Sequence, residues 1–109
     1  MSMNSIKAIN SRSDILNFAD KCVTGKREED YGTPENNFKV IADYWNTYLG
    51  IDKIAAKDVA MMMALLKIAR IQTGKDGHVD SYVDLAGYAA CGGEIATHNS
   101  KQVSYHDFR

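Results

Sequence analysis

Four charged residues lie at helical spacing within the two mostly apolar segments of residues 58–94. Lys67 and Arg70 are three residues apart and Asp80 and Asp84 are four apart, so each pair should share one face of a helix. Charged side chains are rarely buried unless they are paired or bind something. The four residues therefore predict either a ligand site or a structural cluster of ion pairs.

The two pairs suit complementary chemistry. Lys67 offers a phosphate group a point charge, and Arg70 offers it bidentate donors. Asp80 and Asp84 suit Mg²⁺, which prefers oxygen ligands and commonly bridges protein carboxylates to substrate phosphates. The alternative is structural: Asp84 pairs with Lys67 or Arg70, and Asp80 is only an acid near the N-terminus of its helix.

Two long helices must position these residues. Apolar periodicity predicts helices over 58–72 and from residue 79 or 80 to about 95, joined by the turn TGKDGH. Both are apolar nearly all the way round, so each should be buried against several neighbours. Gly87, Tyr88 and Cys91 continue the face of Asp84. Glycines in this last helix weaken it, but they permit close approach of another backbone or a ligand.

Two earlier helices are predicted from their end signals. Ser13 should cap a helix over 14–24. Thr33 should cap the next helix, with Pro34 at its first position and Gly50 just past its end at 49.

The second of these helices has the most regular pattern of apolar and polar residues in the chain. Lys39, Asp43 and Asn46 should point to water from its polar side. The charged segment before it, KREEDYGT, reads as a solvated loop that could close over a site as a lid.

The predicted fold class is all-α, with about four helices in a compact bundle. We expect a flexible N-terminal arm over 1–12, a helical domain over 13–96 and a polar tail over 97–109. Four helices in 109 residues cannot easily cover helices that are apolar on every side. We therefore expect the bundle to be completed as a homo-oligomer.

Composition narrows the classes of partner. A net charge of -1 gives no electrostatic footprint for nonspecific nucleic-acid binding, and no apolar run approaches the roughly 20 residues of a membrane span. The first residues lack the apolar core of a signal peptide, and Cys22 and Cys91 lack metal-ligand spacing. These features predict a cytoplasmic protein with free thiols. Phosphate-binding loops, nucleophile elbows and zinc-binding helix motifs are missing from the sequence.

Three segments in order, DYGTPENNFKVIADYWNTYLG, DVAMMMALLKIAR and DSYVDLAGYAA, resemble a family of small phage- and prophage-encoded domains of unassigned function. The layout is also similar to phage helical domains associated with nucleotide metabolism. More distantly, it is similar to all-α pyrophosphatases of the MazG type, which hydrolyse nucleoside triphosphates with helix-borne acids and Mg²⁺. The MazG pattern pairs Glu-x-x-Glu with Glu-x-x-Asp, and this chain has no Glu-x-x-Glu.

The leading hypothesis is a small phage protein that binds a nucleotide or a nucleotide-like phosphate in the host cytoplasm. Lys67 and Arg70 would hold phosphate, and Asp80 and Asp84 would hold Mg²⁺. The base or sugar side would be lined by Tyr31, Asn37 and Tyr88. Turnover, if there is any, would be pyrophosphate cleavage. The alternative is a non-enzymatic interaction protein that inhibits a host or anti-phage defence factor.

Overall fold

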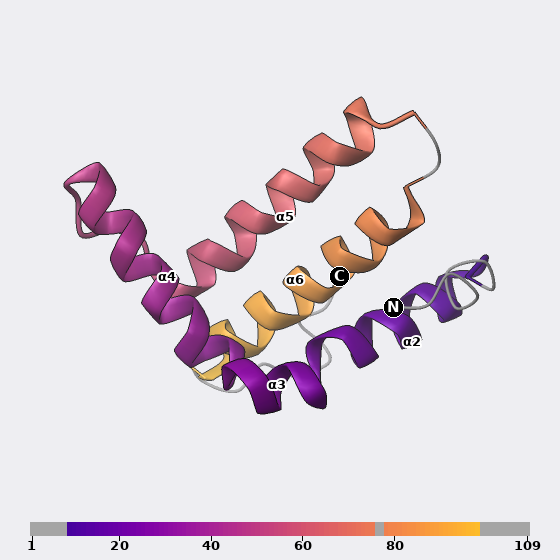
Figure 1. Ribbon diagram of the computed structural model, residues 1–109, viewed down its shortest axis with the longest axis horizontal. Coiled ribbons are helices and arrows are strands. Elements are labelled where there is room, and N and C mark those ends of the chain that lie inside the picture. Colours follow the sequence, from indigo (N-terminus) through magenta and orange to yellow (C-terminus); the bar gives the residue numbers. More distant parts are fainter. Residues whose placement is uncertain (1–8, 76–77, 99–109) are drawn as a thin grey trace.

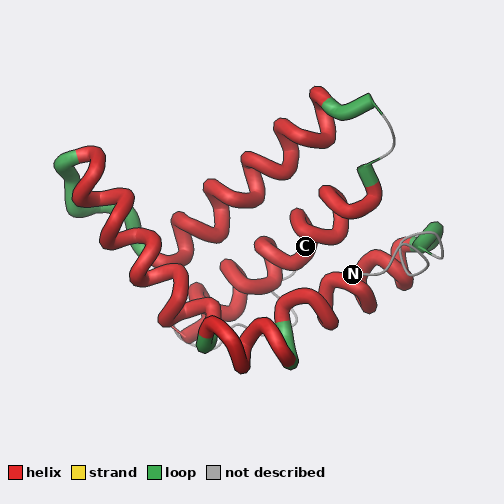
Figure 2. Tube along the Cα trace, viewed as in Figure 1, coloured by secondary structure: helices red, strands yellow, loops and turns green. Residues whose placement is uncertain are grey.

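The computed structural model describes residues 9–75 and 78–98, and all regular structure in them is helical (Figure 2). The elements are α2 (Arg12–Val23), α3 (Lys26–Tyr31), α4 (Pro34–Leu49), α5 (Ala56–Thr73) and α6 (Val79–His98). The predicted all-α class is confirmed. The four predicted helices are present as α2, α4, α5 and α6, and the short α3 is an addition.

The N-cap of helix α2 lies two residues earlier than predicted. Ser11, not Ser13, is the N-cap, and its hydroxyl oxygen accepts a hydrogen bond from the Asp14 N–H at 3.0 Å. The Asp14 carboxylate in turn accepts the Asn10 N–H at 3.3 Å. Together the two bonds satisfy the backbone N–H groups of Asp14 and Asn10 at the start of the helix.

The segment predicted to be a charged loop is the helix α3. Four of its residues, KREE, are good helix formers, and Glu28 and Glu29 lie in the first turn, where the helix dipole favours acids. Gly25 and Gly32 bracket the helix with φ of 66° and 79°, a backbone region that glycine adopts without strain. These glycines allow the chain to turn sharply on both sides of α3.

Helix α4 has the predicted ends. The Thr33 hydroxyl accepts the Asn36 N–H at 3.3 Å, and Gly50 ends the helix in the left-handed conformation. Asn46 does not simply point to water, as predicted. Its amide oxygen accepts the Ile54 N–H at 3.0 Å, and its amide nitrogen donates to the Ile54 carbonyl at 2.9 Å. Asn46 therefore fixes the connection between α4 and α5.

Helices α5 and α6 lie side by side as an antiparallel hairpin (Figure 1). Helix α2 packs along α6, and α4 crosses the end of the hairpin where α5 begins. Helix α3 links α2 to α4 across that end. A hydrogen bond between Nδ1 of His98 and Oε2 of Glu35, 3.0 Å apart, joins the end of α6 to the start of α4.

The core consists of two clusters with mostly small members. The larger cluster joins α4, α5 and α6 and contains Phe38, Ala42, Ala56, Val59, Ala60, Cys91 and Ile95. The smaller cluster joins α2 and α6 and contains Ile9, Ala19 and Val83. Helix α6 therefore contributes to both clusters.

Glycines permit this close packing, as the sequence predicts. A Cβ atom on Gly92 would lie 3.1 Å from Cβ of Ala60 on α5, and one on Gly87 would lie 2.9 Å from Cγ1 of Val23 on α2.

No helix in the described ranges is both long enough and apolar enough to cross a membrane. Of the predicted arm, residues 1–8 lie outside the described residues, whereas Ile9 is buried. Of the predicted tail, residues 99–109 lie outside the described residues.

Candidate functional site

The four charged residues of the α5–α6 hairpin do not form a single cluster. Nζ of Lys67 lies 3.0 Å from Oδ2 of Asp84, and 14% and 35% of the two side chains are exposed. Arg70 and Asp80 are exposed, and neither has an ion pair or hydrogen bond from its side chain to another described residue. The structure therefore shows an ion pair between Lys67 and Asp84, as in the structural alternative, and it leaves Arg70 and Asp80 in solvent.

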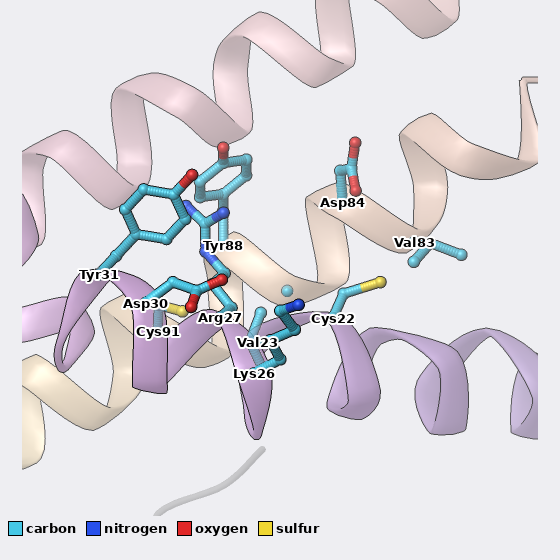
Figure 3. A pocket seen from close by; sticks show the side chains of 11 residues that line it. Cys22, Val23, Lys26, Arg27, Asp30, Tyr31, Val83, Asp84, Tyr88 and Cys91 are labelled. Atoms are coloured by element: carbon cyan, nitrogen blue, oxygen red, sulfur yellow. The ribbon is translucent and has the colours of Figure 1, made fainter. Parts of the chain in front are cut away.

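A pocket of about 500 Å³ opens beside Asp84, between α2, α3 and α6 (Figure 3). Its lining combines cationic, acidic, aromatic and apolar side chains with two thiols: Cys22, Val23, Lys26, Arg27, Asp30, Tyr31, Val83, Asp84, Gly87, Tyr88 and Cys91. The volume falls within the usual range for small-molecule sites, roughly 300–1,000 Å³. This pocket is the strongest candidate for a binding site in the part of the chain that the structure describes.

Helix α6 forms one wall of the pocket from a single face. Asp84, Gly87, Tyr88 and Cys91 recur at three- and four-residue spacing, so they lie above one another along the helix. The sequence predicts this stripe. Gly87 lets α2 approach closely, because a Cβ atom there would meet Val23 at 2.9 Å.

Helix α3 supplies the opposite wall and all of the cations. Lys26, Arg27, Asp30 and Tyr31 line the pocket, and none of the residues of α3 is buried. The guanidinium carbon of Arg27 lies 5.4 Å from the centre of the Tyr31 ring, within the range of a cation–π contact. The charged groups on this wall therefore remain accessible to solvent and to a ligand.

The two tyrosines lie at one end of the pocket and Asp84 at the other (Figure 3). Tyr88 is half-buried, and its ring packs against Phe38 with the ring centres 6.2 Å apart. Tyr31 is exposed. One tyrosine is thus anchored to the core, whereas the other stands on the accessible helix α3.

Both cysteines line the pocket as free thiols. Burial raises the pKa of the Cys22 thiol, and the nearby Asp84 carboxylate raises it further. Burial also raises the pKa of the Cys91 thiol, with a further contribution from Glu94. At neutral pH both groups are protonated and weakly nucleophilic, so the pocket does not present an activated cysteine.

Three of the predicted site residues line the pocket: Tyr31, Tyr88 and Asp84. Asn37 lines a small adjoining cavity of about 10 Å³, which also touches Arg27 and Tyr31.

The other three predicted residues lie elsewhere. Lys67 contacts the site only through Asp84, and Arg70 and Asp80 are not among the residues that line the pocket. Lys26, Arg27 and Asp30 were not predicted as ligand-binding residues, although their segment was expected as a loop that could close over a site as a lid. The available signal was a run of helix formers between two glycines, immediately before the Tyr31-Gly32 pair.

The residues 9–75 and 78–98 contain no cluster of three or more His, Cys, Asp or Glu side chains that could hold a metal ion. Two carboxylates, Asp30 on α3 and Asp84 on α6, do line the pocket. They lie at different ends of the pocket, with Asp30 beside Tyr31, and the Asp84 carboxylate is already paired with Lys67 (Figure 3). The two carboxylates therefore do not form a shared metal site.

Two phage proteins are similar to this chain. It is 46% identical over 77 residues to the Gene 55 protein of Mycobacterium phage D29, covering 71% of this chain and 50% of that protein. It is 43% identical over 76 residues to the Gene 55 protein of Mycobacterium phage L5, covering 69% of this chain and 47% of that protein. The chain thus spans about half the length of these relatives.

No solved structure matches the chain. The matches to phage proteins confirm the expected relationship to small phage-encoded domains of unassigned function. The model of the domain of unknown function DUF6378 matches residues 14–96, which include all of α3 to α5 and most of α2 and α6. The chain therefore belongs to the DUF6378 family.

Proposed function

We propose that the pocket between α2, α3 and α6 binds a nucleotide or a nucleotide-like phosphate. The observation that carries the proposal is the meeting of two cations, Lys26 and Arg27, with two tyrosines around a volume of about 500 Å³. Aromatic faces suit a base, and exposed cations suit phosphate.

The roles in this proposal differ in part from those expected from the sequence. Tyr31 and Tyr88 keep their expected place beside the base or sugar. Arg27 and Lys26 replace Arg70 and Lys67 as the phosphate-binding groups. The charge of Lys67 already has a partner, because its ammonium group lies 3.0 Å from the Asp84 carboxylate.

Arg27 would change its partner when a ligand binds. Its guanidinium carbon lies 5.4 Å from the centre of the Tyr31 ring. A phosphate offers a stronger, charge-assisted bidentate contact than an exposed cation–π interaction. The Tyr31 ring would then be released to stack on the base.

Asp30 and Asp84 would repel a bare phosphate, so the proposal includes Mg²⁺ as the mediator. Mg²⁺ is usually held by one or two carboxylates together with the phosphates of its substrate. Asp30, which lies on α3 with Arg27, would be this carboxylate in place of the expected Asp80 and Asp84, because the Asp84 carboxylate is paired with Lys67. Nucleotide affinity should therefore rise when Mg²⁺ is present.

Isothermal titration of nucleoside triphosphates with and without Mg²⁺ tests the proposal, and Arg27→Gln and Arg70→Gln are a matched pair of variants. Both replace an exposed arginine with a neutral residue of similar length. Losing one charge-assisted hydrogen bond costs about 1.5–3 kcal/mol, so Arg27→Gln should weaken binding by at least about tenfold. Arg70→Gln should bind as wild type does.

Two results would overturn this assignment. Absence of binding by every nucleoside triphosphate, with or without Mg²⁺, would refute the nucleotide site and favour the non-enzymatic interaction protein. Weaker binding in Arg70→Gln but not in Arg27→Gln would return the phosphate site to α5. Release of pyrophosphate, measured in the same samples, would extend the proposal from binding to the MazG-like reaction.

A further inference from the structure

Helix α5 buries its small residues and exposes its large ones. Ala56, Ala60 and Ala64 are buried against the neighbouring helices, together with Val59. Five larger apolar side chains are at least 40% exposed: Met61, Met62, Leu65, Leu66 and Ile68. A helix that served only the core of a monomer would have the opposite arrangement.

These five side chains form one surface, which we call the outer face of α5. Met61, Leu65 and Ile68 follow each other at four- and three-residue spacing, with Met62 and Leu66 beside them. Residues 59–69 carry a single charge, that of Lys67, and this side chain is only 14% exposed because it turns to Asp84. The outer face is therefore uncharged over about three helical turns.

Exposed apolar side chains gather on α5. Of the thirteen large apolar side chains in the described residues that are at least 40% exposed, five lie on this helix. A contiguous apolar surface of this kind marks an interaction site rather than the surface of a monomer.

We infer that the outer face of α5 is the contact surface of a two-fold dimer of this chain. Leu65 lies at the middle of α5, which runs from Ala56 to Thr73. A two-fold axis beside Leu65 would pack two copies of α5 antiparallel and bring Met62 of one copy near Ile68 of the other. The face then covers itself with its own apolar residues, and no exposed charge is buried.

A second copy fits this face better than a charged partner does. Because the face offers no charge for a partner to pair with, an acidic or basic surface docked on it would be desolvated without compensation. An identical apolar stripe has no such cost. The inference is also independent of the proposed nucleotide site, whose lining comes from α2, α3 and α6.

Size-exclusion chromatography with light scattering tests the inference, using Leu65→Glu and Leu16→Glu. Both leucines lie on helices, and both are 63% exposed. We expect the wild type and Leu16→Glu to have twice the chain mass of 12.1 kDa. Leu65→Glu should have the mass of one chain, because dimerisation would bury two like charges beside the axis.

Circular dichroism serves as the control, since a charge on a side chain this exposed should leave the helix content unchanged. A wild type that is monomeric at every concentration up to about 1 mM, where even weak association is detectable, overturns the dimer. A dimer that survives Leu65→Glu overturns the assignment to the outer face of α5, as does a dimer lost only in Leu16→Glu.

Discussion

In the sequence, α5 and α6 are both apolar nearly all the way round. In the folded chain, the side of the hairpin formed by α6 and the side formed by α5 differ in what covers them. The side formed by α6 is covered by α2 and α3 and encloses a pocket lined by charges, tyrosines and thiols. The outer face of α5 leaves its large apolar side chains at least 40% exposed and carries no exposed charge over residues 59–69, although the end of Met61 reaches Gly92 on α6.

The comparison shows that a charged residue in an apolar helix is sheltered only if it lies on the side that other helices cover. Lys67 and Arg70 are only three residues apart, but 14% of the Lys67 side chain is exposed, whereas Arg70 is in solvent. Asp84 lines the pocket, whereas Asp80, one helical turn earlier, does not. Of each pair, one member faces the pocket side and the other does not.

The largest expected effect concerns the sheltered ion pair. Asp84→Ala leaves the Lys67 ammonium mostly buried without its partner. The free energy of unfolding should fall by about 1–3 kcal/mol, less than for a fully buried pair because Asp84 is 35% exposed. Urea unfolding at a fixed protein concentration measures the change.

The exposed pair between Lys39 and Asp43 is the matched control. Its atoms are 2.8 Å apart, closer than in the sheltered pair, but the two side chains are 65% and 60% exposed. Asp43→Ala should change the free energy of unfolding by no more than about 0.5 kcal/mol. If Asp84→Ala and Asp43→Ala lowered the free energy of unfolding equally, the burial of the Lys67–Asp84 pair would have no effect on its contribution, against this prediction. Adding Lys67→Met to Asp84→Ala should recover part of the loss, because it removes the unpaired charge.

A smaller effect separates two glycines of α6. Gly87→Ala forces Val23 on α2 to move, because the new Cβ atom would lie 2.9 Å from a branched side chain. The overpacking exceeds the gain in helix propensity, so the variant should be less stable by up to about 2 kcal/mol. Gly93→Ala meets nothing within 4 Å and should be more stable by about 1 kcal/mol. Thermal unfolding that ranks the two variants in the reverse order would contradict the packing of α2 on α6.

The smallest effect concerns the pocket thiols. Because burial raises the pKa of Cys22 and of Cys91, their thiolates form only above the pH at which a free cysteine ionises, about 8.5. Between the unfolded and folded pKa values the unfolded chain binds fewer protons, so stability should fall as the pH rises through this window. Iodoacetamide should modify both thiols more slowly than free cysteine at pH 8. Faster modification than free cysteine would contradict the burial of the thiols.

Local signals predicted much of the fold correctly. Thr33, Pro34 and Gly50 define α4 because caps and helix ends depend on backbone groups a few residues away. The same reasoning misplaced the start of α2, because Ser11 and Ser13 are both plausible caps, and only the added contact of Asp14 with the Asn10 N–H favours Ser11. Helix α3 was missed because a short run of charges is typical of loops as well as helices.

The candidate site was less predictable. Tyr31, Tyr88 and Asp84, three of the residues named from the sequence, line one pocket, and their roles there stay a prediction. Arg27 and Lys26 were not identified, because their nearness to Asp84 depends on how α3 folds over α6, across more than 50 residues of chain.

The sequence by itself determined the four longer helices, the shared face of Asp84, Gly87, Tyr88 and Cys91, and the apolar surplus of α5. These features follow from residue spacing along one helix and from composition, neither of which depends on the helices that pack against it. Only the tertiary structure decided that Lys67 pairs with Asp84, that α3 lines the pocket with cations and that the outer face of α5 lies uncovered. Each of these depends on which helices pack together, and helix periodicity gives the direction of a side chain but not the identity of what it meets.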